Sequence, residues 1–320
     1  MAVKHSLLKN NRVITLVMIN ITIVVLMSTI KPVTFFTVSN FSGIFTSLAF
    51  DMLLSVGMTL VLMLGGVDLS IGAVVAMSSI ISATIARTYP APIAVAAGLA
   101  MGALIGFING FLVSKAKLAP FIATLGIQTF VRGVCYVKTA GYLISGLPPS
   151  FLNISRGKLF GIPILVIISL SIMFVMGFLL SRLKVFRQMY LTGTSFKAAY
   201  ISGIPADRVK ITGYIICSTL AGLTGVLMAS RYGMGNAQYG GGFEMRAIAA
   251  AVIGGAVMAG GEGNIFGTAL GVFIVAVVNN VFIMFNGSPE WQYAISGIML
   301  VIALYIDTLR SKRAMQKGLL

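Results

Sequence analysis

Residues that could do chemistry are few and scattered in this chain. It has 320 residues, with a single histidine (His5), two cysteines and seven acids against 23 Lys and Arg. His5 lies in a basic N-terminal segment, and Cys135 and Cys217 lie in apolar runs without a metal-ligand spacing. A GxxxxGKS/T phosphate-binding loop does not occur. The sequence therefore predicts neither an enzyme nor a cofactor, and no ATPase activity of its own.

Two isolated charges lie inside apolar runs, where a charge is costly and often functional. Asp51 lies deep in residues 44–64, where it could pair with a cation or be protonated. Arg132 lies in the second half of residues 120–137, and we expect it to extend toward the outer headgroups rather than into a watery cavity. An alternative is a secondary transporter that uses Asp51 and Arg132 as ion-coupling groups.

The window GGVDLSIG separates two apolar runs by only a few residues. Gly65 and Gly66 allow a tight reversal, and Asp68 and Ser70 follow where a helix would begin. We expect Asp68 to cap that helix, either as part of a transport hinge or in a helical hairpin without a transport role. A partial echo, GGEGNIFG at 260–267, suggests an internal repeat of the kind found in transporters.

Uncharged polar residues in the apolar runs are candidates for a translocation path, or alternatively for hydrogen bonds between helices. These candidates are Asn109, Thr124, Gln128, Thr129, Asn279 and Asn280. A glycine-rich segment, 231–246, contains Glu244 and Arg246 near its end, and we expect these two residues at an outer gate.

The elements that position these residues are membrane helices. Hydrophobic residues make up 58% of the chain and charged residues 9%, whereas soluble domains are about a quarter charged. A span needs about 20 apolar residues. We expect one all-α membrane domain over residues 1–320, with about ten spans. They are 13–30, 44–64, 69–86, 93–113, 120–137, 162–180, 211–229, 247–259, 265–285 and 293–305, of which the eighth and tenth are short.

Basic residues give these spans an orientation. The net charge is +16, and the basic clusters alternate with the spans such that both termini, Lys115, Lys117 and residues 182–210 lie in the cytoplasm. Orientation in an anionic bilayer explains the charge better than nucleic-acid binding.

The longest polar interruption is 182–210, with six basic residues and one acid. We expect a short helix there, with Thr194 or Ser195 as its N-cap and Gly203 as its stop. Such a helix could dock on a cytoplasmic partner, or the segment could be an ordinary positive-inside loop.

Four windows in order resemble one family: GMTLVLMLGGVDLSIGAVVAM, PFIATLGIQTFVRGV, TGTSFKAAYISGI and FEMRAIAAAVIGGAVMAGGEGNIFGTALG. The chain resembles, over nearly its whole length, the bacterial ABC importer permeases of the ribose type. The resemblance implies a bundle like that of the vitamin B12 importer permeases, paired in the inner membrane with a second permease subunit. It implies a cytoplasmic ABC ATPase, an extracytoplasmic solute-binding protein and import of a monosaccharide. The implied ATPase-coupling residues are Thr194, Ser195, Lys197, Ala198, Ala199, Ser202 and Gly203.

The chain departs from the family's pattern at Arg246, where an acid is usual, and at Thr194-Ser195, where Gly-Asn is frequent. These departures concern the substrate more than the membership. The alternatives are an ABC permease for a branched-chain amino acid, the ion-coupled secondary transporter and, more remotely, a membrane receptor or assembly scaffold.

Overall fold

The computed structural model describes the backbone of residues 2–285, 287 and 291–316, and the side chains of 13–285, 287, 291–305, 308 and 309. The described residues form fourteen helices and one two-stranded hairpin. The helices are α1 (Ala2–Ile30), α2 (Pro32–Phe35), α3 (Val38–Met63), α4 (Ile71–Ala86), α5 (Ala91–Ser114), α6 (Pro120–Thr139), α7 (Pro149–Arg156), α8 (Ile164–Arg182), α9 (Lys184–Thr194), α10 (Phe196–Ile201), α11 (Ala206–Tyr232), α12 (Phe243–Gly254), α13 (Ile265–Met284) and α14 (Trp291–Gln316). The strands are β1 (Lys158–Leu159) and β2 (Ile162–Pro163).

The predicted helical membrane protein is confirmed at this level. Within the described residues, seven helices are long and apolar enough to cross a membrane: residues 13–30 of α1, and α3, α5, α6, α8, α11 and α13. Shorter apolar helices cover 71–86 and 291–305. The predicted eighth span ends earlier than expected, because Gly255 (φ +119°) turns the chain after Gly254 and its N–H caps the carbonyls of Ala251 and Val252.

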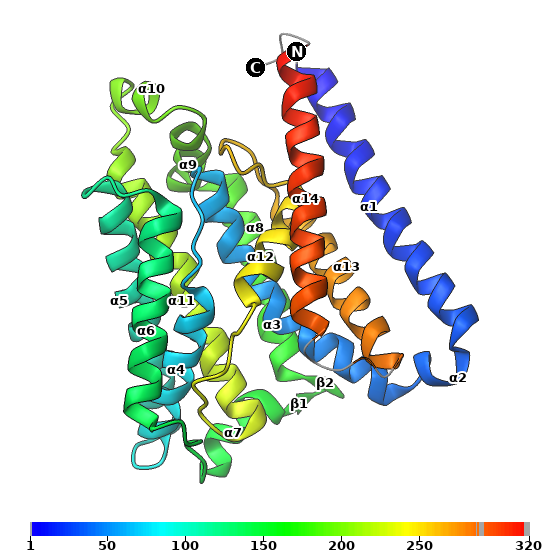
Figure 1. Cartoon of the computed structure of the whole chain (residues 1–320), viewed down its shortest axis with the longest axis vertical. Coiled ribbons are helices and arrows are strands. Elements are labelled where there is room, and N and C mark those ends of the chain that lie inside the picture. The colour runs from blue at the N-terminus through cyan, green and yellow to red at the C-terminus, as the bar shows by residue number, and fades with distance from the viewer. Residues whose placement is uncertain (1, 286, 288–290, 317–320) are drawn as a thin grey trace.

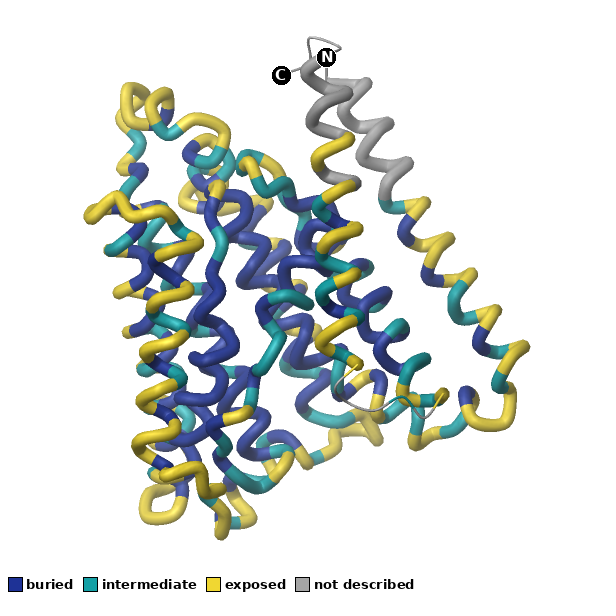
Figure 2. The backbone as a smooth tube through the Cα atoms, viewed as in Figure 1, coloured by how far each residue is buried: buried dark blue, intermediate teal, exposed yellow. Residues whose placement is uncertain are grey.

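α3 lies at the centre of the bundle and is buried from Leu48 to Met63. It contacts α11, α12, α13 and α8, and its side chains contribute to both large apolar cores. α1 lies at one edge, and its residues 13–30 expose most of their apolar side chains, whereas the middle of the bundle is dark blue in Figure 2. Exposed Ile, Val and Phe on the outer helices are the pattern expected of a surface that faces lipid.

A glycine stripe allows α5 to pack closely along α11. A Cβ at Gly110 would lie 2.8 Å from Ile211 Cα, and a Cβ at Gly106 would lie 2.8 Å from Ile215 Cα. A Cβ at Gly102 would lie 3.1 Å from Gly222 Cα. Gly98, Gly102, Gly106 and Gly110, which recur every four residues, therefore serve helix packing.

The bundle has two distinct ends (Figure 1). α10, the start of α1 and the end of α14 lie at one end, called here the α10 end. α7, the β1–β2 hairpin and α2 lie at the other, the α7 end. There the connection after α6 joins the glycine-rich segment through an antiparallel bridge between Ile144 and Gly235. The predicted cytoplasmic location of Met1 and Leu320 falls on residues outside those described.

Candidate functional site

The polar segment 182–210 folds into two helices at the α10 end. α10 is the expected short helix: Ser195 caps it by accepting from the Ala198 N–H at 3.2 Å, and Gly203 (φ +75°) ends it. Ser195 rather than Thr194 is the N-cap, since the Thr194 hydroxyl donates to the Tyr190 carbonyl. The preceding helix, α9, was not predicted.

α10 presents only part of its surface outward. Tyr200 and Ile201 are 70% and 75% exposed, whereas Ala199 is 3% exposed and packs inside the chain. The expectation that Ala199 offers its side chain to a partner is therefore wrong, because the helix turns this face toward its own bundle. The other predicted coupling residues on the outer side are Thr194, Ser195, Lys197, Ala198, Ser202 and Gly203.

The segment before α10 contacts the end of α3 and the second glycine window, 260–267. A Cβ at Gly193 would lie 2.7 Å from Gly261 N and still closer to the Met63 carbonyl oxygen. The Tyr190 hydroxyl donates to the Gly263 carbonyl at 2.8 Å, and burial raises the pKa of this phenol, which keeps it protonated. α9 is thus held against the end of α3 and the loop 255–264.

The two glycine windows also contact each other. Gly65 (φ +70°) and Gly260 (φ +91°) both have left-handed backbones, and a Cβ on Gly260 would lie 3.0 Å from Gly65 Cα. The Gly261 N–H donates to the Met63 carbonyl at 2.9 Å. Only glycine permits two backbones to approach this closely in that conformation. The internal repeat stays a prediction, but its two windows occupy one junction.

Asp68 lies at the centre of a buried polar cluster that joins three parts of the chain. Its Oδ1 accepts from the Ser70 N–H (2.9 Å), the Ser70 hydroxyl (2.6 Å) and the Asn109 amide of α5 (3.3 Å). Its Oδ2 accepts from the Ser218 hydroxyl of α11 at 3.0 Å. The expectation that Asp68 caps this helix is wrong, because Ser70 occupies the N-cap of α4. Asp68 instead fixes the turn before α4 and ties that turn to α5 and α11. No sequence pattern pointed to Ser218.

Asp51 and Arg246 form an ion pair between α3 and α12. Asp51 is one of the isolated charges in the apolar runs, and Arg246 is the base that departs from the family's pattern. Arg246 Nη2 lies 3.1 Å from Asp51 Oδ1, with the two side chains 12% and 3% exposed. The guanidinium also lies over the Phe243 ring, 4.3 Å from its centroid. Each charge thus compensates the other. The sequence around either residue alone does not indicate this pairing.

Arg132 does not extend toward headgroups, so that expectation is wrong. Its Nη1 donates to the carbonyl oxygens of Ala237 and Tyr239, at 2.7 Å for Tyr239, and so holds the glycine-rich segment against α6. Glu244 is 7% exposed and accepts from the Gln128 amide at 3.4 Å, while its other oxygen finds no hydrogen-bond partner among the described residues.

A pocket of about 240 Å³ opens where this segment meets the start of α14. Arg246 lies in its wall together with amide, phenol and aromatic groups. The lining residues are Met228, Gln238, Tyr239, Gly240, Gly241, Gly242, Phe243, Arg246, Gln292, Tyr293 and Ser296. The predicted gate residue Arg246 therefore lines a pocket, whereas Glu244 does not.

The predicted path residues do not gather in one channel. Asn109 belongs to the Asp68 cluster, and the Thr124 hydroxyl accepts from the Leu69 N–H at 3.1 Å. Asn280 donates to Asn40 Oδ1 at 2.7 Å, whereas within the part of the chain that the structure describes both side-chain polar atoms of Asn279 are buried without a partner. The Thr129 hydroxyl donates within its own helix, to Leu125. Most of these side chains make contacts within or between helices, the second of the two roles considered for them.

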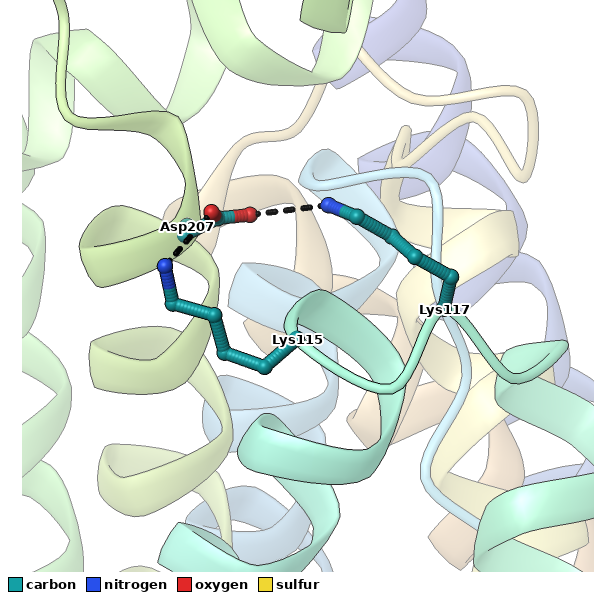
Figure 3. A network of polar contacts seen from close by, with 3 residues as sticks. All are labelled: Lys115, Lys117 and Asp207. Atoms are coloured by element: carbon teal, nitrogen blue, oxygen red, sulfur yellow. Dashed lines mark hydrogen bonds and ion pairs between the residues drawn. The ribbon is translucent and has the colours of Figure 1, made fainter.

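A separate cluster of charged side chains lies on the surface at the α10 end. Asp207, in the first turn of α11, accepts from Lys115 and Lys117 at 3.0 and 3.1 Å, and the two lysines converge on it from the connection after α5 (Figure 3). Both ammonium groups are exposed, so this triad contributes little to stability.

Together the helices define a multi-pass membrane protein whose polar groups line loops and helix contacts rather than a catalytic centre. The family model for the permease component of branched-chain amino acid transport systems matches residues 40–304, and the chain belongs to that family. It is thus a transport permease and not an enzyme, as predicted.

Several relatives align over most of their length. The ribose import permease of Bacillus subtilis (strain 168) is 36% identical, over 90% of this chain and 90% of its own. The D-allose transport system permease of Escherichia coli (strain K12) is 33% identical, over 91% and 90%. The autoinducer 2 import permease of Escherichia coli (strain SMS-3-5 / SECEC) is 30% identical, over 98% and 91%. No solved structure matches the chain.

Proposed function

We propose that the chain is the membrane subunit of an ATP-binding cassette importer for a monosaccharide or a related small polar solute. The family membership, together with relatives named for ribose and allose, carries this proposal. The bacterial inner membrane, cytoplasmic termini and about ten crossings of the vitamin B12 importer type belong to the same proposal. So do a second permease subunit, a solute-binding protein on the outside and ATPase subunits in the cytoplasm.

The exposed side of α10 is the proposed contact for the ATPase. The helix is capped at both ends, presents two large apolar side chains, and directly follows a segment that packs against the end of α3 and the second glycine window. A force on α10 would therefore reach Met63 and Gly261 through backbone contacts. Such contacts transmit rigid-body motion, which is how alternating access is usually achieved.

The proposed outer opening is the pocket beside Arg246. Gln238, Gln292 and Tyr293 offer hydrogen-bonding groups, and Phe243 and Tyr239 offer rings. Because Asp51 neutralises Arg246, the wall suits a neutral polyol better than an anion. We propose Arg246 as a gate residue, and Glu244 as a neighbouring residue that helps to hold the gate segment in position.

The ion-coupled alternative loses its candidate groups. Asp51 is held by Arg246, and Arg132 is held by the carbonyls of Ala237 and Tyr239. Neither side chain is placed to bind and release an ion during transport.

Uptake of labelled ribose or allose into proteoliposomes tests the proposal. We expect uptake with ATP, an ATPase partner and a binding protein, and none with an ion gradient alone. Ile201→Glu should abolish ATP-driven uptake without loss of membrane insertion, because a charge would enter an apolar contact. Val33→Glu at the opposite end, where the valine is 83% exposed, is the matched control. Uptake driven by an ion gradient without ATP would refute the assignment.

A further inference from the structure

A second pocket, of about 330 Å³, lies at the α10 end where three elements meet. Val113 and Ser114 come from the last turn of α5, Lys117 from the following connection, Phe196 from α10 and Lys210 from α11. Lys115 and Asp207, drawn in Figure 3 with Lys117, lie beside it but do not line it. We call it the lysine pocket.

The lysine pocket carries an excess of positive charge. The ammonium groups of Lys117 and Lys210 both lie over the Phe196 ring, 4.7 and 5.1 Å from its centroid. Asp207 is engaged by Lys115 and Lys117, and within the described part of the chain Lys210 makes no ion pair. Two like charges on one ring repel, and an anion between them would relieve that repulsion.

A buried hydroxyl adds a third donor. Ser114 is 1% exposed, lines the pocket, and its Oγ is without a hydrogen-bond partner in the described structure. A buried hydroxyl that lacks a partner costs free energy, so its presence at a cationic wall points to a ligand with acceptor oxygens.

The geometry of the pocket is fixed by the backbone. Lys117 has a left-handed backbone (φ +58°), uncommon for a residue with a side chain. The turn around it is closed by hydrogen bonds from the Ala116 N–H to the Phe111 carbonyl and from the Leu118 N–H to the Leu112 carbonyl, both at 3.1 Å. The ammonium group of Lys117 thus projects from a closed turn rather than a loose loop.

We propose that the lysine pocket binds a phosphate group, presented either by an anionic phospholipid headgroup or as free phosphate. Two ammonium groups and a hydroxyl match the several acceptor oxygens of a phosphate, and the space exceeds what one carboxylate needs. Its position at the polar ends of α5 and α11 corresponds to headgroup depth. A bound phosphate would join α5 and α11 to Phe196 and thereby fix the orientation of α10.

The test uses the full-length permease in a neutral detergent, without transport partners. Binding of inorganic phosphate is followed by equilibrium dialysis, and binding of short-chain phosphatidylglycerol or phosphatidylcholine by native mass spectrometry. Lys210→Gln should weaken phosphate binding about fivefold or more. Ser114→Ala, which changes no charge, should weaken it severalfold.

Arg208→Gln is the matched control, since Arg208 lies two residues from Lys210, is exposed and does not line the pocket. It should change binding less than twofold. Displacement of phosphate by phosphatidylglycerol but not by phosphatidylcholine would assign the site to a headgroup, and saturable phosphate binding without such displacement would assign it to free phosphate.

The proposal is overturned if neither probe binds the wild type, or if Arg208→Gln weakens binding as much as Lys210→Gln. If Arg208→Gln weakens binding as much as Lys210→Gln, the basic surface attracts phosphate only through its overall positive charge, and the lysine pocket is not a specific site.

Discussion

At the residue scale, the buried charges of this permease are held by specific partners. Asp68 accepts four hydrogen bonds from three elements, and Asp51 pairs with Arg246 across two helices. Removing one member of either group leaves polar atoms buried without partners, which costs more than the interaction itself contributes.

Asp68→Ala should lower the free energy of unfolding by about 2 kcal/mol or more, because Asn109 and Ser218 lose their acceptor. Asp68→Asn should lose about half as much, since the Ser218 hydroxyl can reverse and accept. Thermal unfolding in detergent measures both changes, with Asp207→Asn at the surface as the control. Equal loss in the Asn and Ala variants would mean that the charge itself is needed.

Asp51→Leu and Arg246→Met should each destabilise the protein by about 3 kcal/mol, because each leaves an unpaired buried charge. The double variant should regain most of that loss. A double-mutant cycle on thermal stability gives the coupling. Additive losses would show that the two side chains are not paired.

At the element scale, close backbone contacts join α9 to the end of α3 and to the second glycine window. Gly193 has no room for a side chain, whereas Gly126 on α6 has nothing within 4 Å of its Cβ position. Replacing each of these two glycines by alanine therefore distinguishes the effect of close packing from the effect of helix propensity.

Gly193→Ala should cost about 1–3 kcal/mol through overpacking and should slow coupled transport. Gly126→Ala should be neutral or stabilising by up to about 1 kcal/mol. Unfolding midpoints and uptake rates of the two variants give the comparison. If Gly193→Ala behaves like Gly126→Ala, the α9 junction is loose and cannot transmit motion from α10.

At the scale of the whole molecule, the membrane helices can be predicted from the sequence, whereas the contacts of the candidate site cannot. The apolar runs predict α3 and α13 because a membrane demands hydrogen-bonded, apolar helices. The cap at Ser195 is equally predictable, since its partner lies three residues away. The Asp68 cluster and the Asp51–Arg246 pair were not predictable, because they join residues 41 to 195 positions apart that meet only after the helices pack. Arg132 was misjudged for the same reason.

The proposed orientation can be tested across the entire bundle with two labels. Both native cysteines are buried, so they give little background. Ser150→Cys at the α7 end should react with an impermeant thiol reagent in intact cells, and Ser195→Cys at the α10 end should react only after lysis. The reverse pattern would invert the bundle in the membrane.

The Asp51–Arg246 pair also constrains how this chain can diverge. Because either charge alone is costly, a lineage cannot easily replace one without passing through a weakened protein. The two positions should therefore change together: descendants that acquire an acid at 246 should have abandoned the acid at 51, and sequences with neutral residues at one should be neutral at the other. Gene duplicates that recombine between residues 51 and 246 should often yield unstable hybrids, a barrier to exchange set by one ion pair.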